Sequence, residues 1–158
     1  MTRIVAIAIL PLFMNALLGS TKFDDLIAEI GRNEGVPVEL LLSMAYVESR
    51  FTPTAVSSAK AIGILQVKLS TAKGYVPVKK KKDLFDPRKN ITAAARHLVT
   101  LKKIFGTWPR AVAAYFCGGG RVKRELQETG MLSPVCAGYV EKVEAEMWQG
   151  FGLKLDAF

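Results

Sequence analysis

The fold of this chain is decided by the stretch VESRFTPTAVSSAKAIGILQV, residues 47–67. It continues an apolar run, VELLLSMAYVES (38–49), that has helical character. This helix is expected to start near Pro37, a residue tolerated in a first helical turn, and to end before Pro53. Small residues then replace the apolar ones. The stretch therefore predicts a buried helix that carries a carboxyl group, Glu48, close to its end.

Glu48 shares its helix face with apolar side chains. Leu41, Met44 and Ala45 lie seven, four and three residues before it. Burial raises the pKa of a carboxyl group, and a carboxyl with a raised pKa can hold a proton near neutral pH and give it to a leaving oxygen. The pattern therefore predicts either a general acid at Glu48 or a structural ion pair, for instance with Arg50.

The rest of the chain is also helical in pattern. Thr21 and Asp24 resemble a capping box before a helix that Gly35 ends. Further helices are expected over residues 62–72, 91–105 after an Asn90 cap, 107–115 after a Thr107 cap, and 137–148. The glycines Gly118–Gly120 are expected to stop the helix over residues 107–115. Since no alternating strand pattern competes, the sequence predicts an all-α (mainly α) single domain.

Composition fits one folded, basic domain. The chain has 158 residues, of which 50% are apolar, so it is long enough to bury a core. Lys and Arg number 22 against 14 Asp and Glu, which gives a net charge of +8. Such a charge favours a polyanionic partner, whether nucleic acid, anionic lipid or an acidic wall polymer, without choosing among them. The basic run Lys79–Lys82 is interpreted as solvated surface.

The N-terminus has the pattern of a secretory signal. Arg3 precedes an apolar stretch over residues 4–19, and polar residues follow. The alternative is an uncleaved membrane anchor, but the stretch is shorter than the roughly 20 residues that span a bilayer. Pro11 and Asn15 also interrupt it. The expected division is residues 1–20 as signal peptide (or uncleaved anchor) and residues 21–158 as one domain, exported to the periplasm or secreted.

The cysteines and the histidine bound the chemistry further. Cys117 and Cys136 permit one disulfide in an exported chain, and two buried thiols are the alternative. His97 is the only histidine, which excludes a metal site built from a His cluster. No metal and no cofactor is expected.

Several blocks of the sequence resemble one known family. The quoted stretch contains Glu48-Ser49, Phe51, Ala55-Val56-Ser57 and Gly63-Ile64-Leu65-Gln66. Further along come Leu84-Phe85-Asp86-Pro87 with Asn90-Ile91, then Ala113-Ala114-Tyr115-Phe116-Cys117-Gly118, then Gly138-Tyr139-Val140. In this order they resemble the soluble lytic transglycosylase (SLT) domain, a lysozyme-like fold with a substrate groove, related to goose-type lysozyme. The resemblance covers about residues 23–147.

The resemblance implies an activity and a set of site residues. The chain would cleave the β-1,4 bond between N-acetylmuramic acid and N-acetylglucosamine in peptidoglycan, with Glu48 as the single acid and base. Ser57, Gln66, Tyr115 and Tyr139 would line the groove. Their alternatives are a turn cap for Ser57, a surface position for Gln66 and core positions for both tyrosines. The implied fold also brings Cys117 and Cys136 to the same cleft, where their sulfurs could meet.

A single acid implies a mechanism in which the substrate takes part. Most glycosidases use two carboxylates, but Glu48 is the only acid between Ala45 and Gln66, and Asp86 is better explained as the residue that starts a helix. In this family the sugar's own 6-hydroxyl closes a 1,6-anhydro ring. A muramidase that uses water remains an alternative, because both reactions need the same general acid.

The chain also departs from the family pattern. Phe116 stands where the motif usually has Asn, Lys60 where Gly is usual, and Lys68-Leu69 where Met-Pro is common. These departures keep open a third alternative, a catalytically weak wall-binding module. The expected partner is the peptidoglycan glycan strand. Analogy with other small domains adds a secretion or conjugation apparatus, whereas no motif supports nucleic-acid binding.

Overall fold

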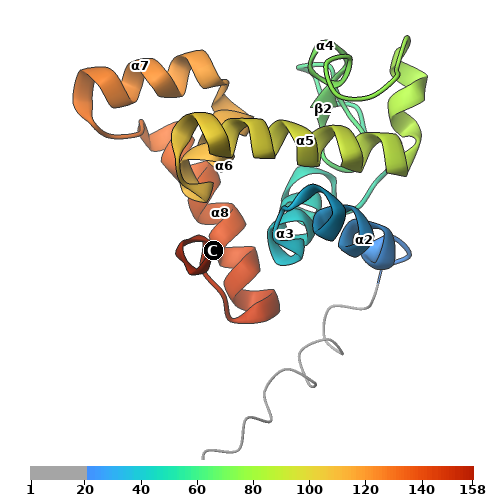
Figure 1. Ribbon diagram of the computed structural model, residues 1–158, viewed down its shortest axis with the longest axis horizontal. Coiled ribbons are helices and arrows are strands. Elements are labelled where there is room, and N and C mark those ends of the chain that lie inside the picture. The colour runs from blue at the N-terminus through green and yellow to red at the C-terminus, as the bar shows by residue number, and fades with distance from the viewer. Residues whose placement is uncertain (1–20) are drawn as a thin grey trace, which may run out of the picture.

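Helices supply almost all regular structure in residues 21–158, the part of the chain that this computed structural model describes (Figure 1). The elements are α2 (Asp24–Glu34), α3 (Val38–Ser49), β1 (Ala61–Ile62), β2 (Val67–Lys68), α4 (Leu69–Ala72), a 3-10 turn η1 (Lys81–Phe85), α5 (Pro87–Phe105), α6 (Trp108–Cys117), α7 (Gly119–Thr129), α8 (Pro134–Phe151) and a second 3-10 turn η2 (Leu155–Ala157). The predicted signal at residues 1–20 lies outside the described residues. None of the helices described is long and apolar enough to cross a bilayer.

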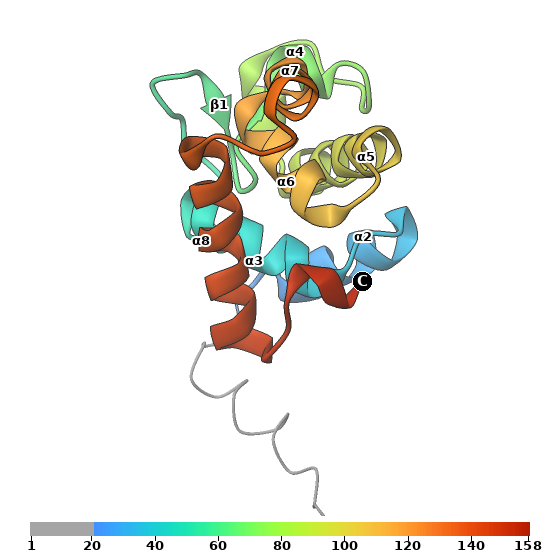
Figure 2. The same cartoon turned by 90° about the vertical axis from the view of Figure 1, so that its left-hand side faces the viewer.

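Helix α3 forms the centre of the core. It packs against α2 on one side and against α8 on the other, and Figure 2 shows α8 running alongside it. Leu41, Met44 and Ala45 are fully buried, as predicted for the helix face that they share with Glu48. Helix α5 spans the molecule and contacts both α2 and α6 (Figure 1). Glu48 is thereby held on a rigid element at the middle of the fold.

The segment predicted as one helix over residues 62–72 is mostly a hairpin, so this prediction is wrong except for its last turn. Strands β1 and β2 pair antiparallel, with Ile62 opposite Val67, and only α4 is helical. The turn between the strands needs left-handed backbone at Gly63 (φ 77°) and Gln66 (φ 47°). A helix cannot contain such residues, because left-handed and right-handed helical conformations do not mix.

Helix α7 was not predicted, because its first turn is made of glycines. Gly118 does end α6, with φ 87° and ψ 135°, but Gly119 and Gly120 then begin α7 at once. Glycine has a low helix propensity, so a helix that begins with glycines is not predicted from sequence. A Cβ on Gly119 would lie 3.6 Å from the Phe105 ring, which shows how closely α7 approaches α5. The segment after the three glycines, for which no helix was predicted, is therefore mostly helical.

Asn90 does not cap α5, so this prediction is also wrong. The helix begins at Pro87, and the Asp86 carboxylate accepts hydrogen bonds from the backbone N–H of Arg88 (2.9 Å) and Lys89 (3.3 Å). Asn90 lies inside the helix and is fully buried. The prediction that Asp86 starts a helix is confirmed. The predicted Thr107 cap and the predicted Gly35 stop are also found.

Candidate active site

Glu48 lies in the last turn of α3 and is partly buried. Burial raises the pKa of its carboxyl group, and a hydrogen bond donated by the Tyr139 hydroxyl to Oε1 offsets part of that increase. Glu48 takes part in none of the ion pairs found in residues 21–158. The Arg50 guanidinium lies instead over the Tyr46 ring, 5.2 Å from its centroid. The alternative of a structural ion pair with Arg50 is therefore not what the structure shows.

Tyr139 connects Glu48 to a second aromatic ring. It comes from α8, is buried, and stacks on Phe116 of α6 with ring centroids 4.3 Å apart and planes 4° from parallel. Burial is the main cause that raises the pKa of the Tyr139 hydroxyl, and the charge of Glu48 adds to it. Tyr139 therefore stays protonated and acts as a hydrogen-bond donor. The resemblance implied this place beside Glu48 for Tyr115, and the structure gives it to Tyr139.

Tyr115 is close enough to feel the charge of Glu48 but makes no hydrogen bond to it. Its hydroxyl donates to the Leu65 carbonyl at 2.6 Å, and its ring lies 5.5 Å from the His97 ring. Burial and then the charge of Glu48 raise the pKa of the Tyr115 hydroxyl, so the two groups are electrostatically coupled. His97 lies 3.1 Å from the Tyr75 hydroxyl through Nδ1, and burial lowers its pKa. A neutral packing histidine fits these contacts.

Ser57 and Gln66 both bind backbone groups of their own segment. The Ser57 hydroxyl accepts from the backbone N–H of Ala61 at 3.1 Å, which is the turn-capping alternative. The Gln66 amide donates to the carbonyls of Gly63 at 3.0 Å and Ala55 at 3.4 Å. Both side chains are only partly buried, so their expected contact with substrate stays a prediction.

The backbone after Glu48 is strained. Arg50, Phe51, Lys60 and Gln66 have φ values of 49°, 59°, 63° and 47°, and they are the only non-glycine residues with positive φ in residues 21–158. A left-handed conformation costs a non-glycine residue roughly 1–2 kcal/mol. At Lys60 the family's usual Gly would avoid this strain. Strained residues are typical of functional sites, and two of these four, Arg50 and Phe51, follow Glu48 within three residues.

Buried Asn90 holds this strained segment, and the sequence interpretation missed it. Its Nδ2 donates to the carbonyls of Ile62 (2.8 Å) and Leu84 (3.1 Å), and its Oδ1 accepts from the N–H of Leu65 (2.9 Å). A Cβ on Gly63 would lie 2.3 Å from Nδ2, so only glycine fits there. One feature of the sequence could have indicated this role, because Asn90 precedes an alanine-rich helix face. A polar side chain buried on such a face needs hydrogen-bond partners.

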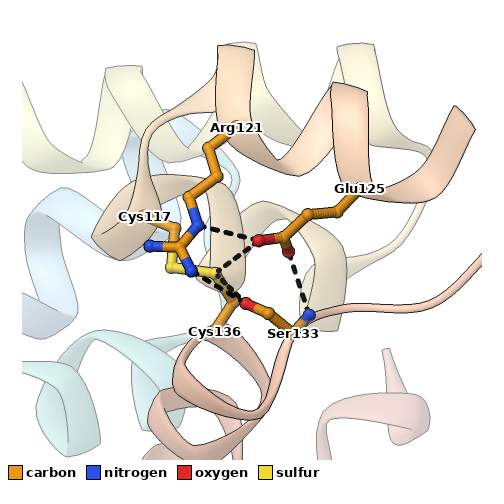
Figure 3. The surroundings of a disulfide bond; sticks show 5 residues. All are labelled: Cys117, Arg121, Glu125, Ser133 and Cys136. Carbon is orange, nitrogen blue, oxygen red and sulfur yellow. Dashed lines mark hydrogen bonds and ion pairs between the residues drawn. A yellow bond between two sulfur atoms is a disulfide. The ribbon is translucent and has the colours of Figure 1, made fainter. Parts of the chain in front are cut away.

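The disulfide between Cys117 and Cys136 is present, with an S–S distance of 2.08 Å (Figure 3). It joins the end of α6 to the first turn of α8. Beside it, the Glu125 carboxylate accepts from the Ser133 N–H (3.0 Å) and from Arg121 Nε (2.7 Å), which lowers the pKa of Glu125 to about 2. The disulfide directly follows Phe116 in sequence and therefore helps to fix the stacked pair.

Two further observations bound the site. A pocket of about 270 Å³ lies along α3 and α8, lined by Tyr46, Val47, Arg50, Lys142, Ala145 and Glu146. Neither Glu48 nor Tyr139 lines this pocket. In residues 21–158 no group of three or more His, Cys, Asp and Glu side chains is placed to hold a metal ion.

Comparison with known proteins gives one consistent result. Residues 25–134 match the family model described as the transglycosylase SLT domain. The chain is 38% identical over 101 residues to the membrane-bound lytic murein transglycosylase D of Escherichia coli strain K12. The aligned residues cover 61% of this chain and 22% of the Escherichia coli protein.

Solved structures show the same relationship. The 70 kDa soluble lytic transglycosylase of Escherichia coli superposes with a TM-score of 0.74 at 24% identity, over 80% of this chain and 24% of that one. An inactive mutant of the lytic transglycosylase Slt from Pseudomonas aeruginosa, with a glutamate changed to glutamine, gives 0.69 at 26% identity, over 77% and 22%. These matches confirm the predicted all-α, lysozyme-like fold class. The chain spans less than a quarter of the length of each of these relatives.

Proposed function

The chain belongs to the transglycosylase SLT domain family, and we propose that it is a peptidoglycan lytic transglycosylase with Glu48 as its single acid and base. The observation that carries the proposal is the desolvated Glu48 carboxyl with the Tyr139 hydroxyl on it. Burial raises the pKa of Glu48, whereas hydrogen bonds lower the pKa values of Glu29, Asp83 and Glu125. The inactive Pseudomonas aeruginosa relative supports a catalytic glutamate in such a protein.

The proposed reaction conserves every atom of the glycan. Protonated Glu48 gives its proton to the oxygen between N-acetylmuramic acid and N-acetylglucosamine, and the bond from that oxygen to C1 of the muramic acid breaks. The N-acetyl group of the same sugar stabilises the positive centre at C1. Glu48, now a carboxylate, takes the proton from the 6-hydroxyl of the muramic acid, and the 6-oxygen bonds to C1. The 1,6-anhydro product forms and the proton is back on Glu48.

This mechanism assigns a limited role to the other site residues. Tyr139 orients the Glu48 carboxyl through its hydrogen bond, and Tyr115 holds the Leu65 carbonyl in the turn between β1 and β2. The substrate is the peptidoglycan glycan strand, reached in the periplasm or outside the cell, and neither metal nor cofactor takes part. A role beside a secretion or conjugation apparatus stays a prediction from family analogy.

Digestion of purified sacculi tests the proposal. We expect the soluble muropeptides to carry anhydro ends, which are one water lighter than reducing ends in a mass spectrum. Reducing ends would show a muramidase that uses water, and would contradict the transglycosylase assignment. Release of no muropeptide by the folded protein would favour the wall-binding alternative. Protein with Glu48→Gln from the same preparation serves as the blank.

Tyr139→Phe is expected to move the alkaline limit of activity to higher pH. The reaction starts from protonated Glu48, so kcat/KM falls as pH rises through the Glu48 pKa. The hydrogen bond from Tyr139 lowers that pKa, and its removal therefore raises it further. A pH profile of kcat/KM on soluble glycan strands measures the change.

Tyr75→Phe is the matched control for this profile, because it removes a hydroxyl that contacts His97 and not Glu48. Its alkaline limit should stay where the wild type has it. A Tyr139→Phe limit that stays unchanged or moves to lower pH would contradict the assigned role of the hydrogen bond.

A further inference from the structure

We propose that Phe116 is a sugar-binding residue, and that the outer face of its ring stacks on a pyranose of the glycan next to Glu48. This inference rests on the proposed function, since it names how the same site grips its substrate. It gives Phe116 a role in holding the substrate, although this residue replaces the Asn that the family motif usually has.

The position of Phe116 carries the first step. Tyr139 covers one face of its ring in parallel at 4.3 Å, yet Phe116 is 51% exposed. The exposed area therefore includes the face turned away from Tyr139. Tyr139, which covers the inner face of the Phe116 ring, also donates the hydrogen bond to Glu48, so the two stacked rings connect the outer face to the acid. A flat apolar surface is thus presented to solvent beside the proposed acid.

The chemistry of sugars fits such a surface. A pyranose ring exposes C–H groups on one face, and their slight positive charge suits the negative face of an aromatic ring. Ligand sites are commonly lined by aromatic side chains that a few polar groups supplement. Phe116 replaces the amide that the family motif usually has here, so this chain would hold the sugar more by its face than by a hydrogen bond.

Phe116 is also held rigidly, which favours binding. Its ring is fixed by Tyr139, and the neighbouring Cys117 is bonded to Cys136 on the helix that carries Tyr139. A contact surface that is already ordered loses little conformational entropy when the ligand binds. Mere cover for Tyr139 would not need a planar ring, because any apolar side chain of similar size would serve. This difference makes the inference testable.

The test measures binding of a pentameric N-acetylglucosamine oligomer by calorimetry, in the Glu48→Gln background. Phe116→Ala and Phe116→Leu are each expected to weaken binding about tenfold, the loss of one aromatic contact. Phe116→Trp should bind at least as tightly as Phe116. Trp148→Ala is the matched control, because Trp148 is similarly exposed (59%) but lies near the far end of α8, and it should change binding less than twofold.

The same substitutions in active protein separate binding from structure. We expect Phe116→Leu to raise KM about tenfold on soluble glycan strands while kcat changes less than about threefold and the melting temperature is kept. Leu at this position binding as tightly as Phe would overturn the proposal, as would a loss of kcat and melting temperature at unchanged KM. Since binding is measured without Glu48, a failure of the proposed catalysis would show separately, as glycan cleavage that survives Glu48→Gln.

Discussion

Glu48→Gln is expected to lower the rate of glycan cleavage by a factor of about 10² to 10⁴, the usual contribution of a general acid. Glutamine has nearly the shape of protonated glutamate and can still accept the hydrogen bond from Tyr139. It cannot release a proton to the leaving oxygen or take one from the 6-hydroxyl. In residues 21–158 no other carboxyl is placed with Tyr139, so nothing replaces it.

The same substitution is expected to leave the melting temperature unchanged or higher at neutral pH. The folded-state pKa of Glu48 is raised above its ordinary value because burial penalises the charged form. Protonated Glu48 is therefore favoured by folding, and this stabilisation is lost as pH rises through the folded-state pKa. A neutral amide avoids the penalty. The gain should disappear in acid, where wild-type Glu48 is protonated too.

Muropeptide release from sacculi and thermal melts followed by circular dichroism measure the two effects. Glu39→Gln, on the first turn of the same helix α3, is the matched control and should keep full activity. Near wild-type cleavage by Glu48→Gln would show that another group supplies the proton. A large drop in its melting temperature would instead mean that the carboxylate is structural.

Sequence patterning predicted the helices that bury one face. Leu41, Met44 and Ala45 define the core side of α3 without reference to any neighbour, and they are buried as expected. Stop and start signals such as Gly35 and Thr107 were also local and correct. Local signals suffice where a residue's own backbone preference and its burial point to the same structure.

The errors fall where distant residues decide the local conformation. Asn90 has the local signature of a cap, but three backbone groups of the hairpin and of η1 draw it into the core. Those bonds in turn hold Gly63 and Gln66 in left-handed conformations that a helical pattern could not reveal. The same distinction explains why only part of the site was predicted. Glu48 stood out by its own pattern, whereas its contact with Tyr139 spans 91 residues of sequence.

Removing the disulfide is expected to destabilise the fold by about 3 kcal/mol, through the double substitution Cys117→Ser and Cys136→Ser. The bond closes a loop between residues 19 apart, and in the chain-entropy model the free energy comes from the restricted unfolded chain. The loss should appear as a lower midpoint of denaturant unfolding. In this model the size of the loss does not depend on helix α7, because that helix exists only in the folded state.

The folded structure itself should survive the loss of the bond. Helix α8 also packs along α3 and α6, and Glu125 of α7 still binds the Ser133 N–H at the start of α8. We therefore expect native circular dichroism below the transition, with a higher KM for glycan because Phe116 and Tyr139 are less firmly fixed. Wild-type protein treated with dithiothreitol should match the double variant, and the double variant should not respond to the reagent. Equal unfolding midpoints for reduced and oxidised wild type would contradict a stabilising role for this bond.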